Sequence, residues 1–412
     1  MFSFVLRLLL IGMFLSFPMP ATAQQTDDPS EGARFRWGPI RFTPTLEITN
    51  FGRDSNVFNE AENPKDDFTT AIGPAVQIWM RPFRSRLNVT TGGQYLFFNK
   101  YEDQRAWNTR NELRWEVPLA RLTPFVGGTY VNSRDRQGFE IDSRARRLDR
   151  GFTGGTGLRI SGKTSFVLSH RRSDIEYDDR ETFFGARLAR ELNRVEEAST
   201  LQFRYALTPL TTFVADTEVG RDRFDSANVR DSDSVRVMSG FELKPAALIS
   251  GSVFVGFRRF NPVSDALADY SGVVAAVKAM YLRSSTRYDV QVDRDIQYSF
   301  RATNPYYALL NTGLKVTQRV TQRWELVAQG SIQRLAYRAL AGAANGPLAT
   351  GTPREQDRVD RGSEVGGGIG FRMNESVRLG FDVRHGTRRS DDTGRRFEGT
   401  RLFGSITYGI QQ

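Results

Sequence analysis

The chain has 412 residues, no cysteine, a formal net charge of +10 and a hydrophobic fraction of only 39%. The lack of cysteine excludes a disulfide framework and thiolate metal sites, and the arginines, spread among 47 acidic residues, argue against a nucleic-acid-binding surface. The low hydrophobic fraction disfavours a soluble core of this size but suits a membrane β-barrel, which needs only a thin apolar band on its outer face.

The first 23 residues have the pattern of a secretory signal peptide. A single positive charge precedes a ten-residue apolar core over residues 8–17, and Ala21-Thr22-Ala23 is an A-x-A cleavage site. The core is about ten residues short of a membrane-spanning helix. An uncleaved N-terminal anchor is the alternative, but we expect cleavage after Ala23 and export to the bacterial envelope.

Beyond about residue 41 the chain alternates apolar and polar residues over stretches of ten to fifteen positions. In Arg287–Tyr298 most even positions are apolar or aromatic and the odd positions are charged or amide, as expected for a strand whose side chains point alternately to its two faces. The pattern recurs at 377–384 and 402–410. Soluble strands usually have about five or six residues, so this length favours tilted strands that cross a bilayer.

The connections between these stretches alternate in length. Eight are short turns, such as 81–85 and 374–376, and nine are long and polar, ending with 338–359 and 389–395. In outer-membrane barrels the short turns face the periplasm and the long loops face outside. This rhythm predicts an all-β fold, namely a transmembrane, antiparallel, up-and-down β-barrel of about 18 strands with both termini in the periplasm; about 16 strands is the alternative.

These patterns divide the chain into three parts: the signal peptide at 1–23, a short periplasmic N-terminal segment at 24–40 and the outer-membrane barrel at 41–412. The last strand, 401–410, is expected to pair with the first, near 42–50, because an open edge cannot be satisfied in lipid.

Aromatic residues gather at both ends of the expected strands, where two interfacial girdles would lie. Those near short turns are Trp115, Tyr205, Tyr281, Trp324 and Phe371. Those near long loops are Phe97, Tyr101, Phe257, Phe260, Tyr298 and Tyr337.

Two sequence features point to a known family. One is Gly52-Arg53-Asp54-Ser55-Asn56-Val57-Phe58 after the first strand, and the other is the strand opener at Phe42-Thr43-Pro44, Leu122-Thr123-Pro124 and Leu207-Thr208-Pro209. With the aromatic, Arg-rich hairpins, they resemble the putative β-barrel porin 2 family of outer-membrane proteins over about residues 41–412. Because some members are similar to barrels encoded with exopolysaccharide biosynthesis and export systems, the resemblance implies an envelope role in polysaccharide passage. It implies no catalytic residues.

The sequence contains no pattern of a catalytic or metal site. Its two histidines, His170 and His385, share strand parity with apolar residues and would face lipid or the outer interface, away from any nucleophile or acid partner. Asp54-Ser55-Asn56 supplies too few ligands for a closed calcium site, and no zinc spacing occurs. We therefore predict a protein that is not an enzyme and has no cofactor.

Charged residues on the face opposite the apolar one are the candidate functional residues. Charges of both signs would hydrate the lumen, either lining a pore or pairing across the wall to stiffen it. The candidate lumen-lining residues are Arg114, Glu116, Arg204, Asp216, Glu218, Arg236, Glu242, Arg287, Asp289, Asp293, Glu325, Arg378, Asp382 and Arg384. At about 18 strands the interior is wide enough for a channel unless a loop folds in, and the Ala- and Gly-rich loop 338–359 is the expected constriction.

Three functions remain open at this point: a porin-like channel, a barrel that serves exopolysaccharide export, and a non-conducting structural or surface-interaction barrel. Conductance in planar bilayers would separate the third from the first two. The expected partners are the outer membrane with its lipopolysaccharide, the barrel-assembly machinery and polysaccharide or export-system components, with no nucleic acid.

Overall fold

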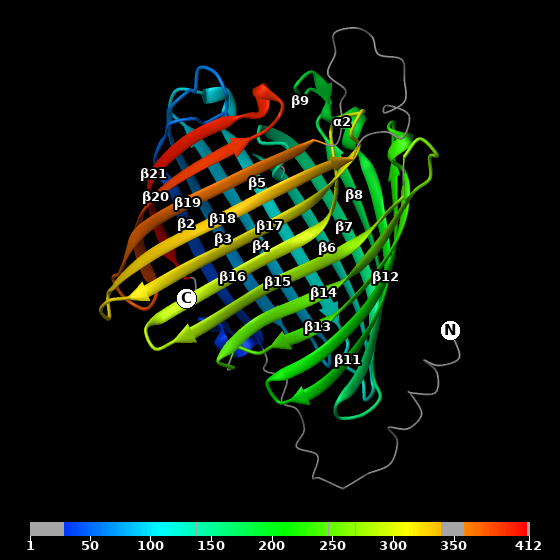
Figure 1. The fold of residues 1–412 in the computed structure, drawn as a ribbon. Coiled ribbons are helices and arrows are strands. Elements are labelled where there is room, and N and C mark those ends of the chain that lie inside the picture. The colour runs from blue at the N-terminus through cyan, green and yellow to red at the C-terminus, as the bar shows by residue number, and fades with distance from the viewer. Residues whose placement is uncertain (1–28, 137, 246, 268, 339–357, 410–412) are drawn as a thin grey trace.

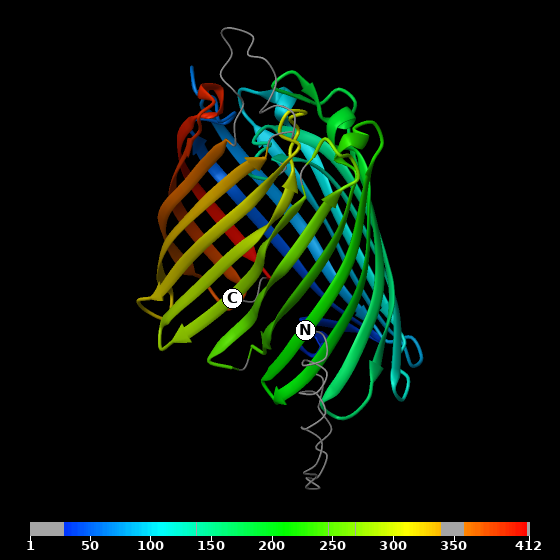
Figure 2. The same cartoon turned by 45° about the vertical axis from the view of Figure 1, so that its right-hand side comes forward.

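The computed structural model describes residues 29–136, 138–245, 247–267, 269–338 and 358–409. The predicted signal peptide and most of the predicted constriction loop, residues 339–357, lie outside these described residues. Within them the chain forms a closed barrel whose tilted strands run side by side around one wall (Figures 1 and 2).

Eighteen strands of the described part of the chain form this wall, and each pairs antiparallel with its neighbours. In chain order they are β2 (Ile40–Asp54), β3 (Asp67–Met80), β4 (Arg86–Phe98), β5 (Ala106–Glu116), β6 (Leu122–Arg136), β7 (Arg144–Arg159), β8 (Thr164–Tyr177), β11 (Arg194–Thr208), β12 (Thr211–Phe224), β13 (Ser232–Leu243), β14 (Ile249–Pro262), β15 (Tyr270–Arg283), β16 (Thr286–Tyr298), β17 (Tyr306–Arg319), β18 (Trp324–Arg338), β19 (Val359–Arg372), β20 (Val377–Arg389) and β21 (Phe397–Tyr408). The predicted fold class and the count of 18 are confirmed.

The barrel closes where the first wall strand meets the last, as predicted. The ladder between β2 and β21 runs from Leu46 opposite Tyr408 to Asp54 opposite Arg401. A bulge interrupts it at Asn50, which has a left-handed φ of 54°, a conformation that asparagine tolerates better than most residues. Below the end of β21, the short strand β1 (Phe35–Trp37) pairs with the beginning of β2 and continues the sheet.

The two ends of the barrel differ in the length of their connections. Short turns lie at one end, together with η1 (Pro29–Gly32) and β1. The long connections at the other end carry the small elements of the described chain, as Figure 1 shows for β9 and α2. These elements are η2 (Glu102–Gln104), β9 (Thr182–Phe183), β10 (Ala186–Arg187), α2 (Leu188–Leu192), η3 (Asn228–Arg230) and η4 (Thr393–Arg395). None of the described helices is long and apolar enough to cross a membrane.

The wall is apolar outside and polar inside. Ile332 and Val365 are among many large apolar side chains that the wall leaves exposed, as expected for a surface that faces lipid. At the short-turn end Trp115, Tyr205 and Trp324 are exposed on this outer face, which agrees with the girdle predicted there.

The girdle predicted at the long-loop end is partly wrong. Phe257 is exposed on the outer face, but Phe260 and Tyr337 are fully buried and Tyr298 is largely buried. These three rings pack inside the barrel. Phe260 and Tyr337 have the inward parity of β14 and β18, whereas Tyr298 turns inward because the β16–β17 hairpin leaves the wall.

The β16–β17 hairpin leans into the barrel at its long-loop end. The ladder between β15 and β16 stops at Arg294 opposite Ala275, whereas β16 continues to pair with β17 as far as Tyr298. The Tyr298 hydroxyl donates to Asp222 Oδ2 of β12 at 2.5 Å. Ile296 and Tyr306, which alternation would place toward lipid, pack instead in a cluster with Phe260. The tip of this hairpin, residues 299–305, is thereby carried over the lumen.

Candidate functional site

The structure places the fourteen candidate residues on the inner face, in alternation with the exposed apolar side chains of the same strands. Whether they line a path for a solute stays a prediction. Eleven of them take part in ion pairs, namely Arg114, Glu116, Arg204, Glu218, Arg236, Glu242, Arg287, Asp289, Glu325, Arg378 and Arg384. Asp216, Asp293 and Asp382 have no ion pair within 4.0 Å among the pairs seen in the described chain.

One group of these ion pairs ties β12, β13, β14 and β16 together. Arg236 donates through Nη2 to Glu218 Oε2 at 3.0 Å and through Nη1 to Asp295 Oδ2 at 3.3 Å. Arg258 Nη1 reaches the other oxygen of Asp295 at 3.0 Å. Because Asp295 lies beyond the point where β16 leaves β15, these bonds hold the inward-leaning hairpin to the nearby strands β13 and β14.

A second group centres on Glu325, whose carboxylate is almost wholly buried between two arginines. Arg372 Nε lies 3.1 Å from Oε2 and Arg378 Nε lies 2.5 Å from Oε1. Gly370 makes room for this arrangement, since a Cβ at that position would lie 2.6 Å from both Glu325 and Arg378 atoms. The glycine-rich run of β19 thus permits close approach of charged side chains across the strand.

Below the long loops the inner wall forms open cavities that are lined by polar and charged residues among others. One of about 470 Å³ is lined by Lys278, Asp289 and Lys315, with small residues such as Gly313 between them. Another of about 460 Å³ is lined by amide side chains that include Gln291, Asn311 and Gln333, and reaches up to Asp142 and Arg388. Such an interior suits water and polar solutes rather than a packed apolar core.

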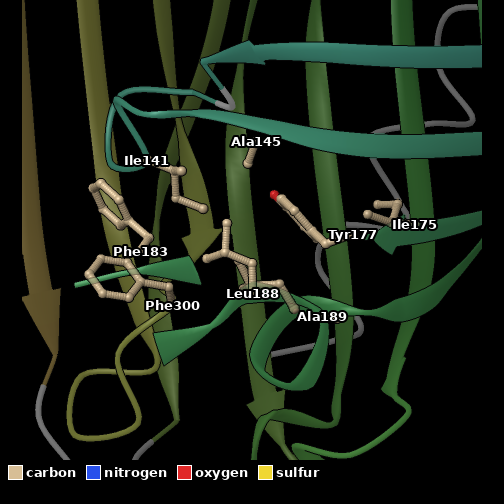
Figure 3. Packing of buried hydrophobic residues seen from close by; sticks show 9 residues of the cluster. Ile141, Ala145, Ile175, Tyr177, Phe183, Leu188, Ala189 and Phe300 are labelled. Atoms are coloured by element: carbon tan, nitrogen blue, oxygen red, sulfur yellow. The ribbon is translucent and has the colours of Figure 1, made fainter. Parts of the chain in front are cut away.

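The long-loop opening is narrowed by a hydrophobic cluster, here called the mouth cluster. Figure 3 shows Phe300, from the tip of the β16–β17 hairpin, beside Phe183 of β9, with their ring centroids 4.8 Å apart. Leu188 of α2 and Ile141 from the β6–β7 loop complete its centre. The buried members are Ile141, Ala145, Ile175, Tyr177, Phe183, Leu188, Ala189, Leu192 and Phe300.

A network of buried charges, here called the mouth network, surrounds this cluster. Its members are Arg301, Arg358, Arg388, Arg395, Glu140, Asp142, Asp360 and Asp392. Asp360 has an exposed fraction of 0% and accepts hydrogen bonds from Arg358 Nε at 3.0 Å and Ser390 Oγ at 2.5 Å. Asp142 lies between Arg388 at 2.7 Å and Arg395 at 3.3 Å. With four arginines and four acids, the network is balanced in charge.

Glu140 links the mouth network to the hairpin tip. Its carboxylate is 1% exposed and accepts from Ser299 Oγ at 2.7 Å and from the backbone N–H of Phe300 at 3.2 Å. Burial raises the pKa of Glu140 above its usual range, and the Ser299 hydrogen bond and the charge of Arg395 only partly oppose this. Arg301 in turn bonds to Asp392 of the β20–β21 loop.

The role of the loop expected to narrow the lumen stays a prediction. Residues 339–357 of the predicted constriction lie outside the described chain, while Arg358 at its end belongs to the mouth network. The described narrowing comes from residues 299–305, which sequence reasoning did not identify. The sequence contained only a weak signal for it, an aromatic and a charged residue at Phe300 and Arg301 in an otherwise small polar loop.

The two histidines and the Asp54-Ser55-Asn56 motif make hydrogen bonds that stabilise the strands and a turn. His170 shares a hydrogen bond with Ser199 and His385 with Thr400, each at 3.0 Å. Asp54 accepts from the backbone N–H of Asn56, whose amide bridges two backbone carbonyls, so this motif forms a turn. Among the described residues no three or more His, Asp or Glu side chains gather in a way that could hold a metal ion.

A closed antiparallel barrel with an apolar outer face and a charged inner face has the architecture of an outer-membrane porin. The family model described as "Putative beta-barrel porin 2" matches residues 28–408. The chain belongs to this family, and it is a porin-like barrel of the bacterial outer membrane. From the general build of such barrels, we expect the short turns to face the periplasm and the long loops to face the outside, and the two openings are named accordingly.

Solved structures of similar shape are outer-membrane proteins of Pseudomonas. OccK3 (OpdO) from Pseudomonas aeruginosa is 11% identical, with 89% of this chain and 95% of that chain covered and a TM-score of 0.48. A BenF-like porin from Pseudomonas fluorescens Pf-5 is 12% identical, with 90% and 99% covered and a TM-score of 0.48. OpdK from Pseudomonas aeruginosa, solved with vanillate, is 9% identical, with 89% and 98% covered and a TM-score of 0.47. No curated protein matches the chain.

Proposed function

We propose that this barrel is a channel for polar solutes whose outer opening is narrowed by the mouth cluster and the mouth network. The observation that carries the proposal is the polar inner wall, whose cavities of about 470 and 460 Å³ lie between the two openings. Because most of the inward charges are paired with opposite charges, we expect weak selectivity between cations and anions.

Conductance of the purified protein in planar bilayers tests this proposal. The wild-type barrel is expected to give small or intermittent openings. Phe300→Ala, which removes the ring between the hairpin tip and Phe183, is expected to give larger or longer ones. Phe83→Ala is the matched control, since Phe83 is fully exposed in a short turn at the other end of the barrel. Equal conductance in all three proteins would contradict a narrowing role for the cluster.

A non-conducting structural barrel is the second candidate, and the buried mouth cluster is the observation that favours it. If neither the wild type nor Phe300→Ala conducts, while both migrate as folded barrels, this second function replaces the first. The described residues contain no feature specific to exopolysaccharide export, so the proposal does not extend to a polysaccharide cargo.

A further inference from the structure

The periplasmic opening contains a pocket of about 420 Å³ that the channel proposal does not use. Residues of η1, β1 and the beginning of β2 cover one side of it, and the inward faces of β3, β4 and β5 form the rest. Its charged lining residues are Arg36, Arg41, Arg81, Arg86, Arg114 and Glu116. We call it the periplasmic pocket.

Even with Arg81 set aside, its charge is unbalanced among the described residues, with four guanidinium groups and one carboxylate. Glu116 is shared by Arg86 Nη1 and Arg114 Nε, each at 3.5 Å, which is long for an ion pair that must serve two cations. The side chains of Arg86 and Arg114 are 46% and 49% exposed, so their donors are accessible from the pocket. Like charges held together repel one another unless an anion joins them, and a pocket of one sign concentrates ligands of the opposite sign.

The floor of the pocket contains unsatisfied polar groups. Trp79 and Asn88 lie directly opposite one another on β3 and β4. The indole Nε1 of Trp79 and the amide Oδ1 of Asn88 are shielded from solvent and have no hydrogen-bond partner within the described chain. Buried donors and acceptors without partners are costly. A small rotation of either side chain toward the pocket would let a bound hydroxyl group supply the missing partner.

We propose that the periplasmic pocket binds a hydroxylated organic carboxylate, such as a sugar acid. Its carboxylate would lie between Arg86 and Arg114, because guanidinium groups bind carboxylates through paired N–H donors. Its hydroxyl groups would accept from the indole N–H of Trp79 and donate to the amide oxygen of Asn88. A pocket of about 420 Å³ is large enough for such a ligand. This binding goes beyond the channel proposal, since it does not require the barrel to conduct.

A carboxylate with neighbouring hydroxyl groups could belong to a free sugar acid or to the acidic units of a polymer. Calorimetric titration of the full-length refolded barrel in detergent, with galacturonate, trigalacturonate and neutral galactose as probes, separates these sources. Galacturonate is expected to bind, more weakly as salt increases, and galactose is not. Much tighter binding of the trimer would assign the pocket to a polymer, and equal binding would assign it to a free acid. Lack of binding by both acids, or equal binding of galactose, would overturn the proposal.

Substitutions then locate the binding. Arg86→Gln together with Arg114→Gln is expected to weaken galacturonate binding at least about tenfold, or about 1.4 kcal/mol. The matched control is Arg84→Gln with Arg121→Gln, two exposed turn residues at the same end of the barrel that do not line the pocket. Equal loss in the control would mean that only general charge attraction is involved, which contradicts a built site.

A conservative variant keeps the proposal falsifiable if the double variant folds poorly. Trp79→Phe preserves an aromatic ring and removes only the indole N–H, so a folded barrel is expected, as judged by the heat-dependent shift of its mobility on a gel. We expect this variant to bind galacturonate about threefold more weakly, the loss of one hydrogen bond of modest net strength. Unchanged affinity in Trp79→Phe and in the double variant would place the ligand elsewhere.

Discussion

The two openings of the barrel contain the same kinds of charged residue in opposite arrangements. At the outer opening four arginines and four acids form the balanced and largely buried mouth network. At the periplasmic opening four arginines besides Arg81 and one glutamate line the pocket in the described chain, and the arginines that contact the glutamate are about half exposed. The difference teaches that an arginine count alone does not indicate function, because paired buried arginines hold loops together while unbalanced exposed ones are available to a ligand.

Chain length explains why the openings differ. The outer connections are long enough to fold back over the lumen and to bring Glu140, Phe183 and Phe300 together. The periplasmic turns are too short to do so, and only residues before β2 partly cover that opening. Charges that have no loop to bury them stay in contact with water and retain their capacity to bind.

Removal of one buried acid from the mouth network is expected to have the largest effect. Asp360→Ala removes the buried carboxylate that Arg358 contacts at 3.0 Å and that lies 3.9 Å from Arg388, which should lower the free energy of unfolding by about 3–5 kcal/mol. Denaturant unfolding in detergent measures it. Asp233→Ala is the matched control, because Asp233 pairs with Arg223 at an exposed site, and it should cost less than about 1 kcal/mol. Similar losses would mean that burial of the network contributes little.

Loss of an aromatic ring from the mouth cluster should have the next largest effect. Phe183→Ala is expected to cost about 3 kcal/mol, because it leaves a cavity beside Phe300 and Leu188. The same unfolding experiment measures this, with the fully exposed Phe83→Ala as control. If the Phe83→Ala cost is as great, the mouth cluster is not a packed unit.

The pH dependence of stability that arises from Glu140 at the outer opening should be a smaller effect than these two substitutions, and it has a definite sign. Burial raises the pKa of Glu140 above its ordinary value of 4.5, so its stabilising contribution is complete below that value and declines as pH rises through the raised pKa. Arg395, Tyr307 and Tyr337 face the same carboxyl group.

Thermal unfolding of the wild type and of Glu140→Gln, measured at a series of pH values from 4.5 upwards, tests the sign of this dependence. The variant cannot ionise, so the stability of the wild type relative to it should fall as pH increases. A difference that grows with pH would mean that the charged form of Glu140 is the favoured one.

Substitution at the periplasmic opening should change stability least. Arg86→Gln removes one of five neighbouring positive charges at an exposed site, so unfolding free energy should change by less than about 0.5 kcal/mol. A loss of several kcal/mol would show that the periplasmic pocket is held together like the mouth network, and the contrast between the openings would fail.

Most of the wall could be predicted from sequence because two local rules determine it. Side-chain alternation identifies each strand and its outer face, and turn residues mark where each strand ends. Near residues 178–200 the sequence shows no clear period, so alternation identifies no strand there. The structure explains this, since the β9–β10 hairpin and α2 lie there among the long loops.

The outer opening could not be predicted, because alternation says which side of a strand faces out only while the strand stays in the wall. Beyond Arg294, β16 leaves β15, so Tyr298 contacts Asp222 inside the barrel instead of joining a girdle. The contact between Glu140 and Ser299 joins loops that are 159 residues apart. No local pattern encodes such a pair.

The seam between β2 and β21 has a consequence for how the barrel assembles. This ladder joins the first and last strands of the wall, it begins only at Leu46, and the bulge at Asn50 breaks it. Pairing β2 with β21 closes the longest loop of chain in the wall, because all the other wall strands lie between these two in sequence. It is therefore the pairing that costs the most chain entropy. Strand β1 folds back on the beginning of β2 through a local hairpin, so it can hold that edge extended before β21 arrives. Amide hydrogen exchange should accordingly be faster along this seam than along the other ladders of the wall, because the closed barrel would open there first.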